Sequence, residues 1–279
     1  MSDRIIRVGH SPDPDDAFMF YGLSSGKVKL PGIRIEHMLE DIQSLNERAI
    51  RAELEVTAIS IATYPLVQDR YLLLPHGASL GSGYGPVVVA REKLTLDQLR
   101  EEEIVIPGSL TTAYLVLRMV LGADVRVRSL PFDAILDEVA SGAARAGLVI
   151  HEGQLTYGDD GLVKCLDLGE WWLLETGLPL PLGANTVRRD LGAETVRSLS
   201  QVLRASIDAA LTNRPEALEY ALAFGRGLDD ARGDRFIGMY VNELTQDYGD
   251  EGREAVRELL ARAEASGAYD APVRIEFVD

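Results

Sequence analysis

Residues 5–18 read IIRVGHSPDPDDAF, and this stretch runs from an apolar strand through a turn with two prolines into a helix. The prolines restrict the turn because the proline ring locks φ and removes a backbone donor. The junction holds Ser11, Asp13, Asp15 and Asp16. In open α/β sheets, ligands bind where strands end and helices begin. The alternative is plain capping, in which Asp15 or Asp16 accepts from the first helical amides. One aspartate is enough for a cap, so three acids and a serine predict ligand contact in addition to capping.

Strands alternate with helices along the chain, which favours parallel α/β sheets. Strands are expected at 5–8, 34–38, 56–61, 71–74, 86–90, 104–107, 125–129, 146–150, 162–167 and 183–187. Helices are expected at 17–23, 42–52, 62–69, 96–100, 111–121, 132–141 and through most of 193–268. The helix and strand over 41–60 resemble those over 132–151, and this match places Ser60 and His151 in equivalent positions. We therefore predict two similar lobes.

The two lobes need two connections, through the strand at 86–90 and the proline-rich segment at 178–182. Residues 1–88 and 184–279 are assigned to a larger lobe with a helical C-terminal tail, and residues 89–183 to a smaller lobe. This layout is the two-lobed α/β fold of periplasmic-binding-protein-like proteins (type II), with a cleft between the lobes and a two-strand hinge. Fold analogy does not by itself give a function.

The composition limits the classes of molecule that the chain can bind. Its 279 residues carry 44 acidic against 28 basic side chains, a net charge of −16, which disfavours nucleic acid and anionic membranes. A small anionic substrate remains compatible with this charge where the amides at a helix N-terminus bind it. There is no apolar run of about 20 residues and no signal-peptide pattern, so a cytoplasmic location is expected. The single cysteine excludes an internal disulfide. The oligomeric state is left open.

His151 is the strongest candidate for catalysis. It follows the apolar segment 146–150 and precedes Glu152 and Gly153, so its imidazole lies at the carboxyl end of a strand. Histidine exchanges protons near neutral pH and serves as a general base. The alternative is a structural histidine that bonds to backbone near a turn. The other three histidines, His10, His37 and His76, are interpreted as structural.

A second junction predicts an anion-binding site. Residues 106–114 read IPGSLTTAY, and Thr111 and Thr112 stand on the first turn of the expected helix, where backbone amides lack partners. Ordinary capping by threonine is the alternative. Neither a P-loop nor a dinucleotide-binding motif is present, because no Gly-Lys-Ser/Thr occurs here and the glycines at 81–85 precede a strand. The aspartates at 13–16 could hold Mg²⁺, but no further acidic cluster supports a site, so no metal is expected.

These motifs, together with others, resemble the 1,4-dihydroxy-6-naphthoate synthase family of the futalosine route to menaquinone. The resemblance lies in Ser11-Pro12-x-Pro14-x-Asp16, Asn46, Ser60, Thr111-Thr112, Ile150-His151-Glu152 and the run TGLPLPLG at 176–183. It implies a carbon–carbon lyase without a cofactor, which opens cyclic dehypoxanthine futalosine and releases the naphthoate and a three-carbon fragment. It also implies that His151 is the proton acceptor. The substrate-binding positions that it implies are Ala58, Ile59, Ser60, Thr111 and Thr112. We further expect Ser11, Asp16 and Asn46, together with Ser60, to bind sugar-derived hydroxyl groups of the substrate.

The chain departs from this family at two positions. Asp13 and Asp15 stand where family members often carry Cys and Asn, which is expected to add negative charge beside a site for an anionic substrate. The exact substrate is therefore left open. The alternatives are a chorismate dehydratase of the same pathway, a non-catalytic solute-binding protein for a small carboxylate, and a metal-dependent phosphoryl-transfer enzyme that rests on the aspartates alone.

Overall fold

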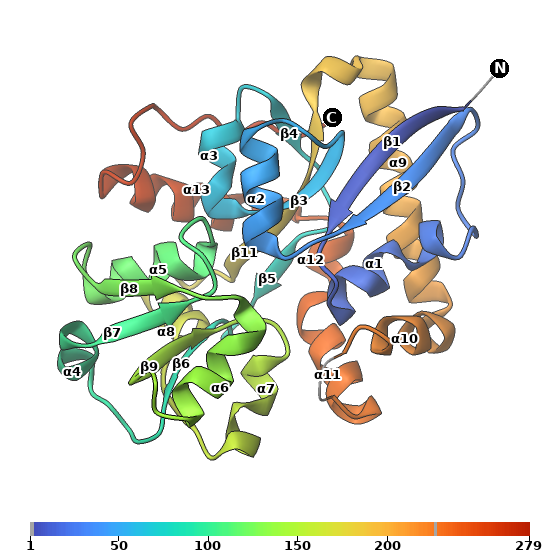
Figure 1. Ribbon diagram of the computed structural model, residues 1–279. Coiled ribbons are helices and arrows are strands. Elements are labelled where there is room, and N and C mark those ends of the chain that lie inside the picture. Colours follow the sequence, from blue (N-terminus) through green and yellow to red (C-terminus); the bar gives the residue numbers. More distant parts are fainter. Residues whose placement is uncertain (1–2, 226–227) are drawn as a thin grey trace. The chain divides into compact units, whose positions relative to one another are not determined.

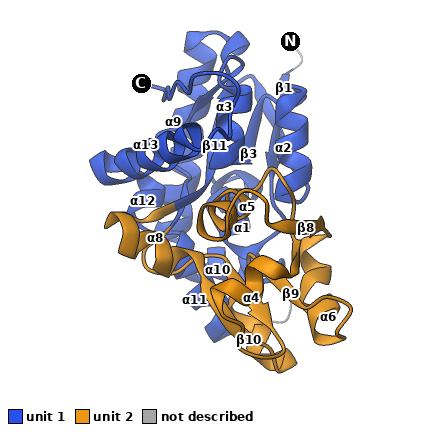
Figure 2. Cartoon of the chain, turned by 90° about the vertical axis from the view of Figure 1, so that its left-hand side faces the viewer, with its two compact units in different colours: residues 1–80, 181–279 blue, residues 81–180 orange. Residues whose placement is uncertain are grey.

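The computed structural model describes residues 3–225 and 228–279 (Figure 1). The chain divides into two compact units, residues 1–80 with 181–279 as unit 1 and residues 81–180 as unit 2 (Figure 2). It leaves unit 1 within β5 (Ser79–Gly81) and returns at the start of β11 (Leu180–Arg188), and these two strands pair. The boundaries suggested by the sequence, after residues 88 and 183, fall inside β6 (Val87–Ala90) and β11.

The main sheet of unit 1 has the order β2-β1-β3-β11-β4. It consists of β1 (Arg4–His10), β2 (Ile33–Leu39), β3 (Val56–Ser60), β11 and β4 (Tyr71–Leu73), with β5 paired to β11. The first three strands are parallel to one another, and α1 (Pro14–Ser24) and α2 (Ile42–Ile50) connect them. This βαβαβ arrangement places the starts of both helices near the carboxyl ends of the strands.

The sheet of unit 2 repeats that order as β8-β7-β9-β6-β10. Its strands are β8 (Arg126–Ser129), β7 (Glu103–Ile106), β9 (Ala146–Val149), β6 and β10 (Val163–Asp167). Here α5 (Thr112–Leu121) and α6 (Ile135–Ala140) connect the three parallel strands. The internal similarity read from the sequence is thus present in the topology, with β3 and β9 at the same place in their sheets.

The two sheets are mixed, with the expected parallel strands beside antiparallel ones. β11 runs antiparallel to both β3 and β4, and β6 runs antiparallel to both β9 and β10. β6 and β11 each follow a crossing between the units. A strand that enters a sheet after such a crossing is not connected to its neighbour by a βαβ crossover, which is the connection that makes neighbouring strands parallel.

The remaining helices cover the sheets or form the C-terminal part of unit 1. They are α3 (Tyr64–Val67), α4 (Leu96–Glu101), α7 (Gly153–Thr156), α8 (Leu168–Thr176), α9 (Ala193–Thr212), α10 (Arg214–Leu222), α11 (Asp230–Tyr240), α12 (Glu243–Gln246) and α13 (Gly249–Ala265), with 3₁₀ turns at 61–63, 132–134, 157–160 and 189–191. The sequence analysis did not predict α7 and α8. For α8 the signals were present, because Asp167 caps it and Gly177 ends it at φ 72°. Among the described residues, no helix is both long and apolar enough to cross a membrane.

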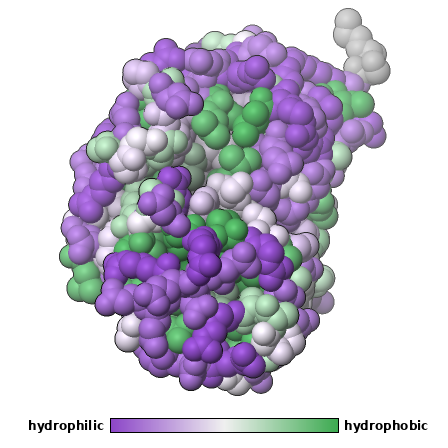
Figure 3. All heavy atoms as spheres, turned by 60° about the vertical axis from the view of Figure 1, so that its left-hand side comes forward, coloured by the Kyte–Doolittle hydropathy of each residue, from purple (hydrophilic) through white to green (hydrophobic). Residues whose placement is uncertain are grey.

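The C-terminal half of α1 packs against α9, and this contact fixes the position of the whole helix, including its start. A Cβ atom on Gly22 would lie 2.7 Å from the Cα of Ser206, so glycine allows the two helices to approach closely. The Ser206 hydroxyl donates to the Met19 carbonyl at 2.9 Å and accepts from the Leu23 amide at 3.1 Å. Apolar residues of α1, β1 and α9 form the core of unit 1 around this contact. On the face drawn in Figure 3, hydrophilic side chains predominate, in keeping with the high charge.

Candidate active site

The turn before α1 is built by reciprocal hydrogen bonds. Asp13 is the N-cap residue of α1, and its Oδ1 accepts from the Asp16 amide at 3.2 Å. Asp16 in turn accepts through Oδ2 from the Ser11 amide at 2.7 Å. Pro14 at the first helical position needs no amide partner, which suits this start. The capping interpretation therefore accounts for Asp13 and Asp16, and Asp16 shapes the loop that carries Ser11.

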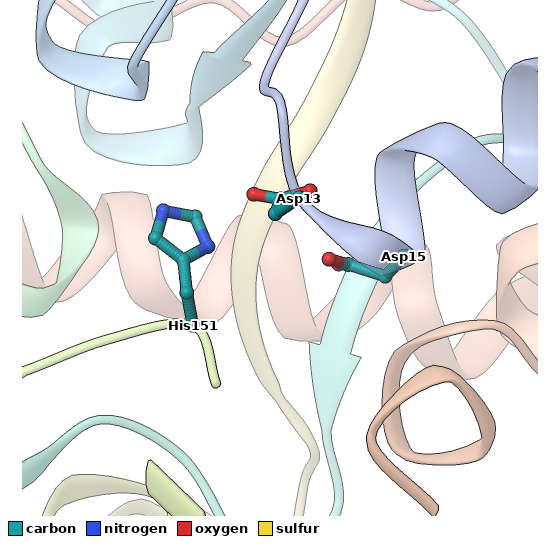
Figure 4. A group of neighbouring side chains, drawn as sticks. All are labelled: Asp13, Asp15 and His151. Carbon is teal, nitrogen blue, oxygen red and sulfur yellow. The ribbon is translucent and has the colours of Figure 1, made fainter. Parts of the chain in front are cut away.

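Asp15 has no comparable structural task. Figure 4 shows its side chain beside that of Asp13 at the start of α1. Its exposed fraction is 7%, and the Ser79 hydroxyl lies 3.5 Å from its Oδ2. Its Oδ1 and the Oγ of the buried Ser11 have no hydrogen-bond partner among the residues that the structure describes. Buried polar atoms without partners are costly in free energy, so each needs an explanation.

The charge expected from Asp15 is reduced by its surroundings. Burial is the largest cause that raises the pKa of its carboxyl well above the ordinary value, and the carboxylates of Asp13 and Asp16 raise the pKa further. Both effects disfavour the ionised form. The negative charge that Asp13 and Asp15 were expected to add beside this site is therefore reduced at Asp15.

Ser60 ends β3 and is held by Asn46 of α2. The Asn46 side chain donates to the Ser60 hydroxyl at 3.0 Å and accepts from the Ser60 amide at 2.8 Å, with both residues buried. On the β1 side, pairing with β3 reaches only Val56 and Thr57, so the later residues of the strand extend past that ladder. The structure thus brings together Asn46, Ala58, Ile59 and Ser60 at one strand end of unit 1.

In unit 2, Thr111 caps α5. Its hydroxyl donates to the Gly108 carbonyl at 2.9 Å and accepts from the Tyr114 amide at 3.2 Å. Thr112 follows as the first helical residue and is buried. Capping therefore describes Thr111, which accepts from the Tyr114 amide, and the start of α5 is the positive end of the helix dipole. An anion at this place would bind to amides that Thr111 keeps in position.

His151 lies two residues beyond β9 in an unusual backbone conformation. Its φ is 53°, and Ala52 is the other non-glycine residue described with positive φ. For a residue with a Cβ this conformation costs about 1–2 kcal/mol. The imidazole meets the Phe132 ring edge-on at a centroid distance of 4.8 Å, and Figure 4 shows it extending from the turn. All four residues of β9 are buried, so the turn starts from a rigid strand. Strained backbone of this kind is typical of functional sites.

Phe132 was not foreseen as a neighbour of His151. It begins the 3₁₀ turn before α6, and β9 follows that helix. The sequence match between 41–60 and 132–151 had already connected the helix that begins at Phe132 with the strand before His151. Phe132 itself, an aromatic residue at the start of that helix, could have been recognised as a neighbour of His151 from this match.

The other histidines are structural, as expected. His10 stacks on Phe20 with ring centroids 4.2 Å apart, and its Nε2 lies 3.0 Å from Nδ1 of His37. Burial lowers the pKa of His10 to about 3 and also lowers the pKa of His37. The Nε2 of His76 lies 3.1 Å from the Ser200 hydroxyl, and burial lowers the pKa of His76 to about 4. All three are therefore neutral near pH 7 and pack as uncharged rings.

The fold itself defines a class. The fold is similar to that of the alkanesulfonate-binding protein SsuA from Xanthomonas axonopodis pv. citri bound to MOPS, with a TM-score of 0.71 and 12% identity over 96% of this chain and 94% of that one. At this identity the likeness shows the fold alone. The chain has the periplasmic-binding-protein-like fold that the sequence predicted.

Residues 6–265 match the family model described as menaquinone biosynthesis, and the chain belongs to this family. It is 44% identical over 274 residues to a 1,4-dihydroxy-6-naphthoate synthase of Thermus thermophilus, covering 98% of this chain and 99% of the relative. A synthase of the same name from Streptomyces coelicolor is 40% identical over 277 residues, 97% of each chain. The structure of protein AF1704 from Archaeoglobus fulgidus is 46% identical, with a TM-score of 0.91 over 95% of this chain and 98% of that one. The chain is therefore an enzyme similar to these synthases.

Proposed function

We propose that the chain converts cyclic dehypoxanthine futalosine into 1,4-dihydroxy-6-naphthoate and a three-carbon fragment. The observation that carries the proposal is His151, which is held in a left-handed turn directly after a buried strand. The similarity to two synthases over nearly their whole length supports the choice of product. The proposal includes the cytoplasmic location expected from the sequence, and a small anionic substrate rather than nucleic acid or membrane as the partner.

The substrate carboxylate is assigned to the start of α5. The helix dipole favours an anion there by about 0.3–1 kcal/mol, and the amides near Thr112 add hydrogen bonds. Thr111 contributes by holding these amides through its bonds to Gly108 and Tyr114. With a net charge of −16 on the chain, such local donors are needed to bind an anion.

Replacing Thr111 with valine tests this assignment. The change removes the cap of α5 at nearly constant volume, so we expect a loss of about 1 kcal/mol of stability in urea unfolding. We also expect kcat/KM to fall, because the amides lose their fixed position. Thr95→Val is the matched control, since Thr95 caps the nearby α4 of unit 2. If both variants lose the same activity, the start of α5 is not the carboxylate site.

The hydroxyl groups of the substrate are assigned to Ser11 and to the end of β3. Ser60 offers its hydroxyl there, and Asn46 keeps it in one orientation. The backbone of Ala58 and Ile59 belongs to the same strand end. Asp16, which was expected to contact substrate, acts by holding the Ser11 amide.

His151 is assigned the role of proton acceptor. Removal of a proton from the bound substrate starts cleavage of a carbon–carbon bond, and formation of the aromatic naphthoate drives the reaction. General-base catalysis of this kind contributes ~10²–10⁴-fold in rate. Phe132 packs against the imidazole and limits its orientations. No step in this scheme requires electron transfer, so it needs no redox cofactor.

The decisive test is incubation of the purified protein with cyclic dehypoxanthine futalosine, followed by mass spectrometry. The proposal expects the naphthoate and an equimolar three-carbon fragment without an added cofactor. Unchanged substrate bound to the protein would indicate a solute-binding protein instead. Turnover of chorismate in its place would identify the dehydratase of the same pathway, and loss of activity on chelation would indicate a metal-dependent enzyme.

A further inference from the structure

We propose that Asp15 acts as a neutral carboxyl that shares its proton with Asp13 and accepts, through Oδ1, a hydrogen bond from a hydroxyl group of the substrate. Ser11 supplies a second hydroxyl contact beside it. This inference deepens the proposed function and rests on it. It assigns substrate contact to Asp15, the middle acid of the turn, and structural roles to the acids on either side.

The three carboxyl groups of the turn have different tasks. Asp13 accepts from the Asp16 amide, and Asp16 accepts from the Ser11 amide, so both serve the start of α1. Asp15 makes no bond to a backbone amide outside its own residue, and its Oδ1 has no partner among residues 3–225 and 228–279. The Ser11 hydroxyl has none either, although the residue is 98% buried, with an exposed fraction of 2%. Two buried polar atoms without partners at one helix start are a site that a ligand completes.

The chemistry of the pair determines its charge. A carboxylate oxygen of Asp15 lies within 4.8 Å of one of Asp13. Two carboxyl groups this close share a hydrogen bond when one of them carries the proton, since an ionised carboxylate is an acceptor only. The proton belongs to Asp15, because Asp13 also accepts from the Asp16 amide at the helix start, where negative charge is favoured. The Oδ1 of Asp15 is then a carbonyl-like acceptor.

The surroundings of Asp15 agree with this state. Within unit 1, the charged groups that act on it are Asp13 and Asp16, while β5 presents the uncharged hydroxyl of Ser79. Burial and both neighbouring carboxylates raise its pKa. A neutral Asp15 also removes one negative charge from a turn that is assigned to bind part of an anionic molecule. The partner fits best as a neutral hydroxyl of the sugar-derived part of the substrate.

Kinetics of two variants test the contact. Asp15→Asn keeps a donor toward Asp13 and a carbonyl oxygen toward the substrate, so we expect kcat/KM for cyclic dehypoxanthine futalosine within about threefold of the wild type. Asp15→Leu loses both, and we expect kcat/KM to fall by about 10- to 100-fold. Asp250→Asn, in the exposed first turn of α13, is the matched control and should leave activity unchanged. The proposal is overturned if Asp15→Leu is fully active, or if Asp15→Asn is as impaired as Asp15→Leu.

The pH dependence of stability gives a readout that does not involve activity. An acid whose pKa is higher in the folded than in the unfolded chain stabilises the fold at low pH, and this contribution is lost as pH rises from about 3.9 through the folded pKa. Asp15→Asn removes that loss. We therefore expect its Tm relative to the wild type to increase between pH 5 and pH 8.5, while Asp250→Asn shows no such trend.

The kinetic measurements and the pH profile of Tm together distinguish a failure of the proposed function from a failure of this inference. A wild-type protein that does not turn over the substrate refutes the proposed function and the substrate contact together, while the Tm profile still decides whether Asp15 is neutral. A Tm difference that decreases with pH shows an ionised Asp15 and overturns the inference even in an active enzyme.

Discussion

His151→Ala is expected to lower kcat by ~10²–10⁴-fold while the protein stays folded. The variant removes the only group assigned to accept the substrate proton, and it leaves β9 and the start of α5 unchanged. KM is expected to change little, because binding is assigned to other residues. Steady-state kinetics with the naphthoate measured by mass spectrometry gives the result, and thermal unfolding checks the fold. Wild-type turnover in this variant would falsify the assigned mechanism.

The backbone conformation of His151 offers a control for strain. His151→Gly also removes the imidazole, and it relieves the positive φ, so it should be more stable than His151→Ala by about 1 kcal/mol. Ala52→Gly relieves the same strain at a position far along the chain from His151 and should remain fully active. Equal inactivity of both His151 variants, with different stabilities, assigns the loss to the missing imidazole.

Asn46→Leu is expected to destabilise the protein by about 2–6 kcal/mol. The change keeps the number and branching of the side-chain heavy atoms, but it leaves the Ser60 amide and hydroxyl without the partners that Asn46 supplies. Each buried polar group that loses its partner costs about 1–3 kcal/mol, and both residues are buried. Urea unfolding followed by circular dichroism measures the effect. Activity in the folded fraction should also fall, because Ser60 is no longer held in one orientation.

Ser60→Ala distinguishes the cost of losing the bond to the Ser60 hydroxyl from the cost of losing both bonds between Asn46 and Ser60. It removes only the bond from the Asn46 side chain to the hydroxyl and keeps the bond from the residue 60 amide, so it should cost less than Asn46→Leu. The double variant should cost less than the sum of the two single variants, because the residues share one pair of bonds. Additive losses, or an Asn46→Leu protein as stable as the wild type, would show that this pair does not hold the strand end.

Local sequence signals predicted much of the candidate site. The two prolines and the acids before α1 indicated a capped helix, but the cap was expected at Asp15 or Asp16, and the structure shows it at Asp13, one turn earlier than a helix from Ala17 requires. The glycine and threonines before α5 indicated another, which Thr111 caps. The repeat that matched Ser60 to His151 corresponds to two sheets with the same strand order. These signals succeed because capping and periodicity depend on residues a few positions apart.

Other expectations failed where distant segments decide the outcome. The antiparallel directions of β6 and β11 follow from the two crossings between units, which no short stretch of sequence encodes. Helix α8 was missed, although Asp167 and Gly177 mark its ends. The edge contact between Phe132 and His151 also depends on how the segment before α6 lies beside β9.

The sequence by itself determined the family, the alternation of strands and helices, and the two helix starts that carry polar groups. Only the tertiary structure decided what each aspartate at the first start does. Asp15 and Asp16 are adjacent and chemically identical, yet Asp16 accepts from the Ser11 amide while Asp15 is buried next to Asp13 and Ser79. The physical reason is that consecutive residues on a helix point about 100° apart. The partner that each one meets therefore depends on segments folded against the helix from elsewhere in the chain.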